Sequence, residues 1–190
     1  MRHLAINTFW DTILGMKSIE RLRLINISLN KAVNWSEMFE KHMNLSEFHL
    51  ESTPFPSNEF TLISDRKLNE NPNIISFSLI DCNITSIQTN LMNTWFELKM
   101  ISLSNNMINE LKRSWFHSTL PSLWSLDLSY NMIETIPQDF FNGMTAIRKL
   151  RLDNNRLKTL HKSWFQPIWP LLREFSIDRK YTPDYLPLET

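Results

Sequence analysis

Apolar residues recur along this chain in a fixed order, at intervals of roughly two dozen residues. The clearest copy opens at Leu123, where Leu126 and Leu128 follow in the order Leu-x-x-Leu-x-Leu and Asn131 comes three residues later. Seven copies open at Ile19, Leu45, Ile74, Leu98, Leu123, Ile147 and Leu172. Self-similarity at a fixed period of this length indicates an array of stacked repeats rather than an ordinary globular domain.

Within each copy, the Leu-x-Leu alternation has period two, which predicts a short strand with one buried face. Successive coils place these strands side by side in a parallel sheet, because no coil can bury its apolar face alone. An asparagine after the strand offers a donor and an acceptor to backbone groups at the turn. We predict buried turn residues at Asn106, Asn131 and Asn155, with Cys82 and Thr53 as smaller substitutes.

The frame fades towards both ends of the chain. Residues 1–18 include TFWDTILGM, which is similar to SWFQPIWPL near the C-terminus, so we predict a partial repeat there, a solenoid of about seven coils over 19–180, and a tail over 181–190. Lys180 stands where the asparagine belongs, and burying a lysine costs several kcal/mol, which marks the end of the solenoid. Prolines between Leu50 and Ile74 predict a loop, either a binding element or a neutral insertion.

The frame closely resembles the leucine-rich repeat, over roughly Ile19 to Lys180. Its length resembles the typical class of about 24 residues, found mainly in extracellular and receptor ectodomains such as those of Toll-like and related invertebrate proteins. The resemblance implies an α/β repeat solenoid, a curved right-handed superhelix with short parallel strands on its concave face. The Trp-Phe pairs that begin at Trp95, Trp115 and Trp164 would fill the convex wall, which should be irregular or short-helical, not stranded.

By the same resemblance, the function is non-catalytic recognition of a protein ligand on the concave face, in a receptor-like or secreted protein at the cell surface or outside the cell. The alternative is a structural or adhesion segment that uses its convex surface or rims. Ectodomains of this kind usually carry cysteine-rich caps, a signal peptide and often a membrane anchor. The chain shows none of these, so we expect a fragment, a truncated gene model or a degenerate relative.

The composition argues against several classes of function. Twenty basic and twenty acidic residues cancel, so there is no net field to attract nucleic acid or an anionic membrane. No apolar run of about 18 residues predicts a membrane span. With two glycines, the chain cannot build a phosphate-binding loop. Its five histidines are scattered and its one cysteine, Cys82, is predicted to face inward, so we expect no metal site, no cofactor and no enzyme.

Residues between the leucines point out of the sheet and are the candidates for partner binding. Trp124 is the only one of seven tryptophans predicted on that face, and Arg148 and Arg173 follow it in the same place of the next two coils. Together with Tyr130 and Arg151, they have the composition of an interface hot spot. The alternative is ordinary surface with local charge pairing.

Charge pairing between neighbouring coils is the simplest expectation for most charged positions on this face. Asp127 occupies the same repeat position as Arg151, one coil earlier, and Lys149 is related to Glu174 in the same way. Each pair should therefore form a salt bridge that adds little to stability. The like charges of Arg148 beside Arg173, and those of Asp153 beside Asp178, need compensation from crossed neighbours or from a partner.

Four glycosylation sequons stand in the first half of the chain, at Asn26, Asn34, Asn44 and Asn83. Their number favours a secreted protein. A glycan on Asn26 would block that end of the concave face, which directs binding towards the coils that open at Leu98 to Leu172.

Overall fold

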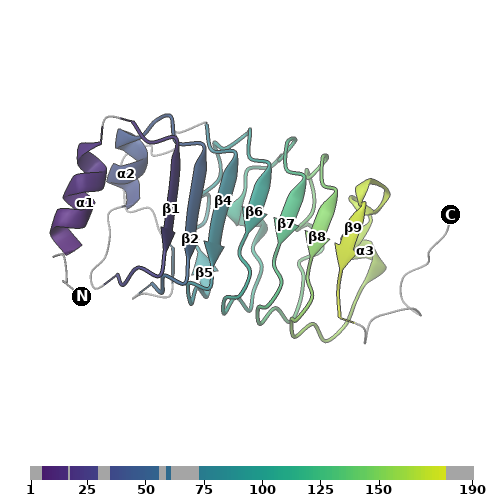
Figure 1. Ribbon diagram of the computed structural model, residues 1–190. Coiled ribbons are helices and arrows are strands. Elements are labelled where there is room, and N and C mark those ends of the chain that lie inside the picture. The colour runs from purple at the N-terminus through teal and green to yellow at the C-terminus, as the bar shows by residue number, and fades with distance from the viewer. Residues whose placement is uncertain (1–5, 17, 30–34, 56–58, 61–72, 179–190) are drawn as a thin grey trace.

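The computed structural model describes residues 6–16, 18–29, 35–55, 59–60 and 73–178. Seven strands form one parallel sheet in which the strands follow one another in sequence order (Figure 1). They are β1 (Arg21–Ile25), β2 (Glu47–Glu51), β4 (Ser76–Ile80), β6 (Met100–Ser102), β7 (Ser125–Asp127), β8 (Lys149–Arg151) and β9 (Glu174–Ser176). This confirms the predicted α/β repeat solenoid with one short strand at each Leu-x-Leu motif.

The strand register places the repeated apolar positions in line. The second residue of each strand pairs with the second residue of the next, so that one row runs across the sheet: Leu22, Phe48, Phe77, Ile101, Leu126, Leu150 and Phe175. Every member of this row is buried except Phe175, which is partly buried. Period-two alternation therefore leaves the residues between them on the outer face of the sheet.

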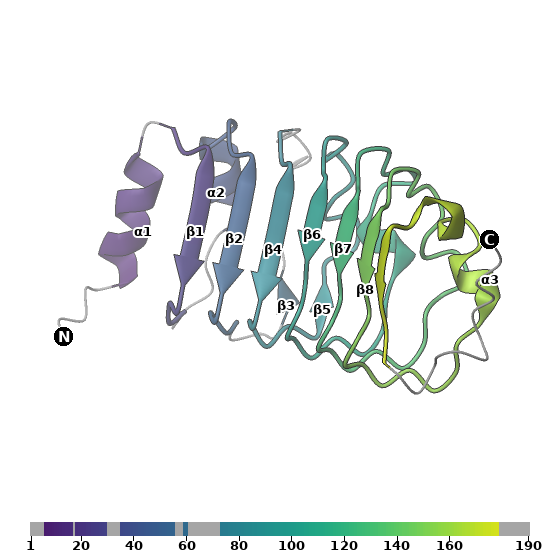
Figure 2. The same cartoon turned by 45° about the vertical axis from the view of Figure 1, so that its right-hand side comes forward.

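The wall behind the sheet is mostly irregular, with short helical turns (Figure 2). These turns are α2 (Trp35–Lys41), η1 (Arg113–Trp115), α3 (Lys162–Phe165) and η2 (Trp169–Leu171). The exception is a two-residue parallel pairing of β3 (Glu59–Phe60) with β5 (Ser86–Ile87). Our expectation of no strand in this wall is therefore wrong at β5. This strand lies before Trp95 in the chain, and its residue Ile87 is buried in the core.

An α-helix lies beside β1 at the N-terminal end of the sheet (Figures 1 and 2). This helix, α1, spans Ile6–Gly15, and the buried His42 ring places Nε2 3.2 Å from the backbone oxygen of Ile13. Whether residues 1–18 are a partial repeat stays a prediction. Lys180 and the tail lie outside the described residues, as does most of the segment between Leu50 and Ile74.

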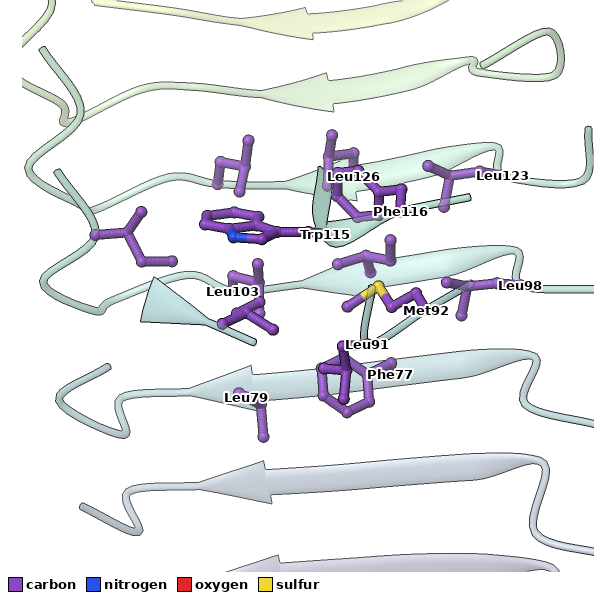
Figure 3. Close-up of a cluster of buried hydrophobic side chains, with 14 of the residues drawn as sticks. Phe77, Leu79, Leu91, Met92, Leu98, Leu103, Trp115, Phe116, Leu123 and Leu126 are labelled. Carbon is purple, nitrogen blue, oxygen red and sulfur yellow. The ribbon is translucent and has the colours of Figure 1, made fainter. Parts of the chain in front are cut away.

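Buried aromatic side chains of neighbouring coils pack against one another and connect the core along the solenoid. Figure 3 shows Trp115, from the back wall, among the leucines of two neighbouring strands. Phe48 and Phe77 stack with ring centroids 5.6 Å apart, and Phe141 and Phe165 stack at 5.5 Å. Aromatic pairs of this kind add about 1 kcal/mol each beyond the area they bury. The predicted filling of the wall by Trp95, Trp115 and Trp164 is confirmed, since all three are buried.

One feature of the turns was not predicted. The residue that precedes each buried turn position has a left-handed backbone in the six coils where it is described. These residues are Asn26, Ser52, Asp81, Asn105, Tyr130 and Asn154, with φ between 47° and 58°. Asparagine and aspartate tolerate this conformation because their short polar side chains bond locally, whereas a tyrosine there is strained.

Candidate recognition surface

The concave face is formed by the outward residues of the seven-stranded sheet. At its strand-start edge lie Lys99, Trp124, Arg148 and Arg173, which follow one another across β6 to β9. The backbone fixes their order, because Trp124 N donates to Lys99 O at 3.0 Å and Arg148 N donates to Trp124 O at 2.8 Å. Neighbouring strands lie about 4.8 Å apart, so the four side chains are in lateral reach of one another.

Trp124 is the exposed tryptophan of this face, as predicted. It is 41% exposed, whereas Trp35, Trp95, Trp115 and Trp164 are buried. Trp124 and Arg148 are therefore brought together as the sequence suggested, and Arg173 continues the line, with its backbone N donating to Arg148 O at 2.8 Å.

Tyr130 is not part of this cluster. It follows β7, six residues after Trp124, which corresponds to as much as about 20 Å of extended chain. It is 52% exposed, its φ is 54°, and it stands at the strand-end edge, where its N donates to Asp153 O at 2.9 Å. The two exposed aromatics predicted as one patch thus occupy opposite edges of the concave face.

Arg151 lies between the two edges and is held by carboxylates. Its guanidinium forms salt bridges with Asp127 at 3.2 Å and with Asp153 at 3.3 Å. Burial works to lower the pKa of Arg151, but the hydrogen bond to Asp153 and the charge of Asp127 outweigh it and raise the pKa. The predicted Asp127–Arg151 pair is confirmed, and the role of Arg151 as a partner contact stays a prediction.

Two further predictions concern charged residues of neighbouring coils. Lys149 and Glu174 form the expected salt bridge, at 2.7 Å. The like charges of Asp153 and Asp178 are compensated locally, since Asp153 pairs with Arg151 and an Asp178 oxygen accepts from the backbone N of Asn154 at 2.7 Å. The same hydrogen bonding lowers the pKa of Asp153: burial opposes the change, but bonds from Ser176 and Arg151 outweigh it.

Arg148 and Arg173 have no such compensation among the described residues. Neither is within salt-bridge distance of a carboxylate in that part of the chain, and neither is Lys99. Arg148 donates from Nη1 to the backbone oxygen of Ile147 at 2.9 Å, which leaves its charge unneutralised. The sequence places Lys99 at the same repeat position as Trp124, one coil earlier, but we did not select it as a candidate. That shared position was the signal that could have identified it.

The predicted turn residues are buried and bonded across coils. Asn131 donates from Nδ2 to the backbone oxygens of Leu103, Leu128 and Ser129, at 2.8 to 3.2 Å, and its Oδ1 accepts from the backbone N of Ile108. Asn106 and Asn155 repeat this arrangement in their own coils. Each asparagine therefore ties its own coil to the one before.

Cys82 fills the same place in an earlier coil. It is fully buried, and Sγ lies 3.2 Å from the backbone oxygen of Ile80. Burial raises the pKa of its thiol to about 11. A thiol that stays protonated at neutral pH is a poor nucleophile, which fits a structural role.

Three of the four sequon asparagines are described, and all three are exposed: Asn26, Asn44 and Asn83. Asn34 lies outside the described residues. Among the residues that the structure places, no three metal-binding side chains of the His, Cys, Asp and Glu types gather in one spot. Over the same residues, no helix combines the length and the apolar character needed to cross a bilayer.

The convex side carries the features that an alternative binding surface would use. Phe96 is 45% exposed, and its ring lies edge-on to His117 at 4.8 Å between centroids. A shallow hollow of about 650 Å³ opens beside His117, lined by Asn90, Asn93, Arg113, Ser114, Phe116, Ser118, Asp139 and Asn142.

Comparison with known proteins agrees with this architecture. A model of the leucine rich repeat family matches residues 72–133, 96–157 and 121–179, which together make up more than half of the chain. No curated protein is a significant match.

Two solved structures are similar in fold. One is the crystal structure of a TLR13–ssRNA13 complex, with 24% identity and a TM-score of 0.67, over 84% of this chain and 21% of that one. The other is the Toll–Spatzle complex, described as a hub in Drosophila development and innate immunity, with 17% identity and a TM-score of 0.66, over 93% of this chain and 23% of that one. The chain thus spans about a fifth of either protein's length.

One expectation loses its support in these comparisons. We excluded nucleic acid because the net charge is zero, yet one protein of similar fold is seen in complex with single-stranded RNA. Net charge does not describe how charge is distributed, and Lys99, Arg148 and Arg173 show that it is uneven on this face.

Proposed function

Because this chain belongs to the leucine-rich repeat family, we propose that it is a recognition module that binds a protein partner without catalysis, through the concave face over β6 to β9. We further propose that it works in a receptor-like or secreted protein, at the cell surface or outside the cell. The likeness to Toll and TLR13 supports this setting by fold alone.

The observation that carries the proposal is Trp124, which is 41% exposed between Lys99 and Arg148, two cations that form no salt bridge with any carboxylate the structure describes. Tryptophan and arginine are the residues most enriched in binding hot spots. The exposed part of the Trp124 ring is apolar surface that a partner can bury.

Tyr130 supports the same face by a separate argument. A tyrosine with φ of 54° is strained, whereas other coils use asparagine, aspartate or serine at this place. Strain of this kind costs about 1 kcal/mol and is concentrated at functional positions. We propose that Tyr130 forms a second contact at the strand-end edge, separate from the cluster around Trp124.

The test compares two sets of variants against one protein captured by the wild-type chain. Replacing Trp124, Arg148 and Arg173 together with alanine should weaken binding of the captured protein by about a hundredfold or more, because truncating one hot-spot side chain costs roughly 2 kcal/mol and the three costs add only in part. Surface plasmon resonance measures the dissociation constant, and circular dichroism checks that the fold is kept. Unchanged binding by a folded triple variant would sink the proposal.

The alternative function is adhesion through the convex surface, which the exposed Phe96 favours. It predicts that the chain associates with itself and that Phe96→Ala abolishes this association. Sedimentation equilibrium of the wild-type chain and of Phe96→Ala decides between the two. Under our proposal, Phe96→Ala is the matched control, which keeps the binding that the triple variant loses.

A further inference from the structure

The strand-start edge of the concave face differs from the rest of that face in how its cations are compensated. On the first two strands, Arg21 pairs with Glu47 and Arg23 pairs with Glu51, both at 3.3 Å. On the last strands, Lys149 and Arg151 are also paired. Among the residues that the structure describes, the cations of this face without a salt bridge form the basic row, which we define as Lys99, Arg148 and Arg173 with Trp124 between the first two.

We infer that the basic row binds an extended acidic segment of a protein partner, running across the strands, with an apolar side chain resting on Trp124. The inference rests on the proposed function and names the chemistry of the partner. Arginine is suited to a carboxylate because its planar fork donates two parallel hydrogen bonds.

The dimensions of the row fit a short stretch of chain. Three strand spacings separate Lys99 from Arg173, which is about 14 Å. An extended peptide advances about 3.4 Å per residue, so four or five residues cover this length. Because side chains alternate along an extended peptide, carboxylates two residues to either side of one apolar residue then face the cations while that residue meets Trp124.

Met100 enlarges the apolar part of this surface. It is 39% exposed, and it pairs with Ser125 in the register, so it lies diagonal to Trp124 on the neighbouring strand. An apolar side chain of the partner would be buried between these two residues, which removes water from the surrounding charge pairs and strengthens them.

The acidic residues of the same coils are placed so that they do not oppose such a segment. Asp153 and Asp178 stand near the strand-end edge, five residues along the chain from the row, and Glu174 is engaged by Lys149. The face is therefore positive at one edge and negative at the other, which also fixes the direction from which an acidic partner approaches.

A long polyanion fits this arrangement less well than an acidic peptide. The row offers three cations over about 14 Å. Beyond Lys99 the same edge continues with Ile75, Ser46 and Glu20, so a nucleic acid strand that extends past the row meets no further cation there. Binding of single-stranded nucleic acid uses a groove that stays positive along the strand. The experiment includes RNA as an arm for this reason.

The experiment uses the full chain and four labelled probes, followed by fluorescence anisotropy at low and at high salt. The first probe is a peptide of four glutamates around one phenylalanine; the second replaces the glutamates with glutamine, and the third replaces the phenylalanine with alanine. The fourth is a uridine oligonucleotide of matched length. We expect the first probe to bind at least about tenfold more tightly than the second, with a difference that shrinks as salt screens the charges.

Two variants with the same chemistry locate the site. Arg148→Gln with Arg173→Gln should remove about tenfold or more of the glutamate preference, since both lose an unpaired cation. Arg21→Gln with Arg23→Gln removes two arginines from the same face and should leave the preference unchanged, because those cations are already paired. Trp124→Ala should remove the advantage of phenylalanine over alanine.

Three results would overturn the inference: equal binding of the glutamate and glutamine peptides, equal loss in both double variants, or tighter binding of RNA that depends on Arg148 and Arg173. These results leave the proposed function standing if the triple alanine variant of Trp124, Arg148 and Arg173 still weakens binding of the captured protein. If the folded triple variant also binds the captured protein normally, both proposals fail.

Discussion

The first three coils and the next three build the same sheet with different turn chemistry. In the coils of β6, β7 and β8, an asparagine donates to backbone oxygens of its own coil and of the coil before. In the coils of β1, β2 and β4, the same place holds Ile27, Thr53 and Cys82. The strands stay in register across the whole sheet, so stacking of the core sets the fold and the turn residue tunes its stability.

Thr53 shows how a smaller residue meets part of the demand. Its hydroxyl donates to the backbone oxygen of Glu51 at 2.9 Å and accepts from the backbone N of Ile27 at 3.3 Å. Asn131 makes four such bonds where Thr53 makes two. We infer that the coils of β6 to β8 are the more rigid ones, and these coils also carry Lys99, Trp124 and Arg148 of the basic row.

The largest expected effect is the loss of an asparagine turn. Asn131→Ala removes the partners of buried carbonyl and amide groups, so the free energy of unfolding should fall by about 3 kcal/mol. Thr53→Ala is the matched change in the other region and should lower it by about 1 kcal/mol. Urea denaturation measures both; similar losses in the two variants would contradict the ranking of the regions.

The next effect concerns Cys82 and appears at high pH. Burial raises the pKa of its thiol from 9.0 to about 11, so between these values the folded state keeps a proton that the unfolded state loses. Stability that is present below pH 9 should therefore decline as the pH rises to about 11, by roughly 2 kcal/mol.

The measurement is the unfolding free energy against pH for the wild-type chain and for Cys82→Ala, which lacks the thiol. The difference between the two curves isolates Cys82 from the lysines and tyrosines that titrate in the same range. Parallel curves would mean that the thiol is as accessible in the folded chain as in the unfolded one.

The smallest expected effect is a gain. Tyr130→Asn places a residue that tolerates the left-handed backbone at φ of 54°, so the free energy of unfolding should rise by about 0.5 to 1 kcal/mol. The reverse change, Asn105→Tyr at the same place in the preceding coil, should lower it by a similar amount. Thermal unfolding of both variants tests this, and a loss in Tyr130→Asn would show that the tyrosine ring contributes packing.

The sequence was a good guide to the repeats and a weaker guide to the surface. The period-two pattern located every strand of the seven-stranded sheet, since a misplaced register would bury polar residues in each coil at once. The pattern did not reveal that Trp124 and Tyr130 lie at opposite edges of the concave face, because it says only that both side chains point outward. It also missed the short pairing of β3 with β5, which joins segments far apart in the chain.

The sequence by itself determined that this is a leucine-rich repeat solenoid, because a regular apolar frame leaves only one way for each coil to bury its leucines. The tertiary structure decided which outward charges are neutralised. Pairing depends on side-chain reach between coils, so Arg151 is held by Asp127 and Asp153. Arg148, beside Trp124, and Arg173 on the next strand form no salt bridge within the described part of the chain. The difference between paired and unpaired cations cannot be read from the repeat positions alone, because it depends on how the side chains of neighbouring strands meet.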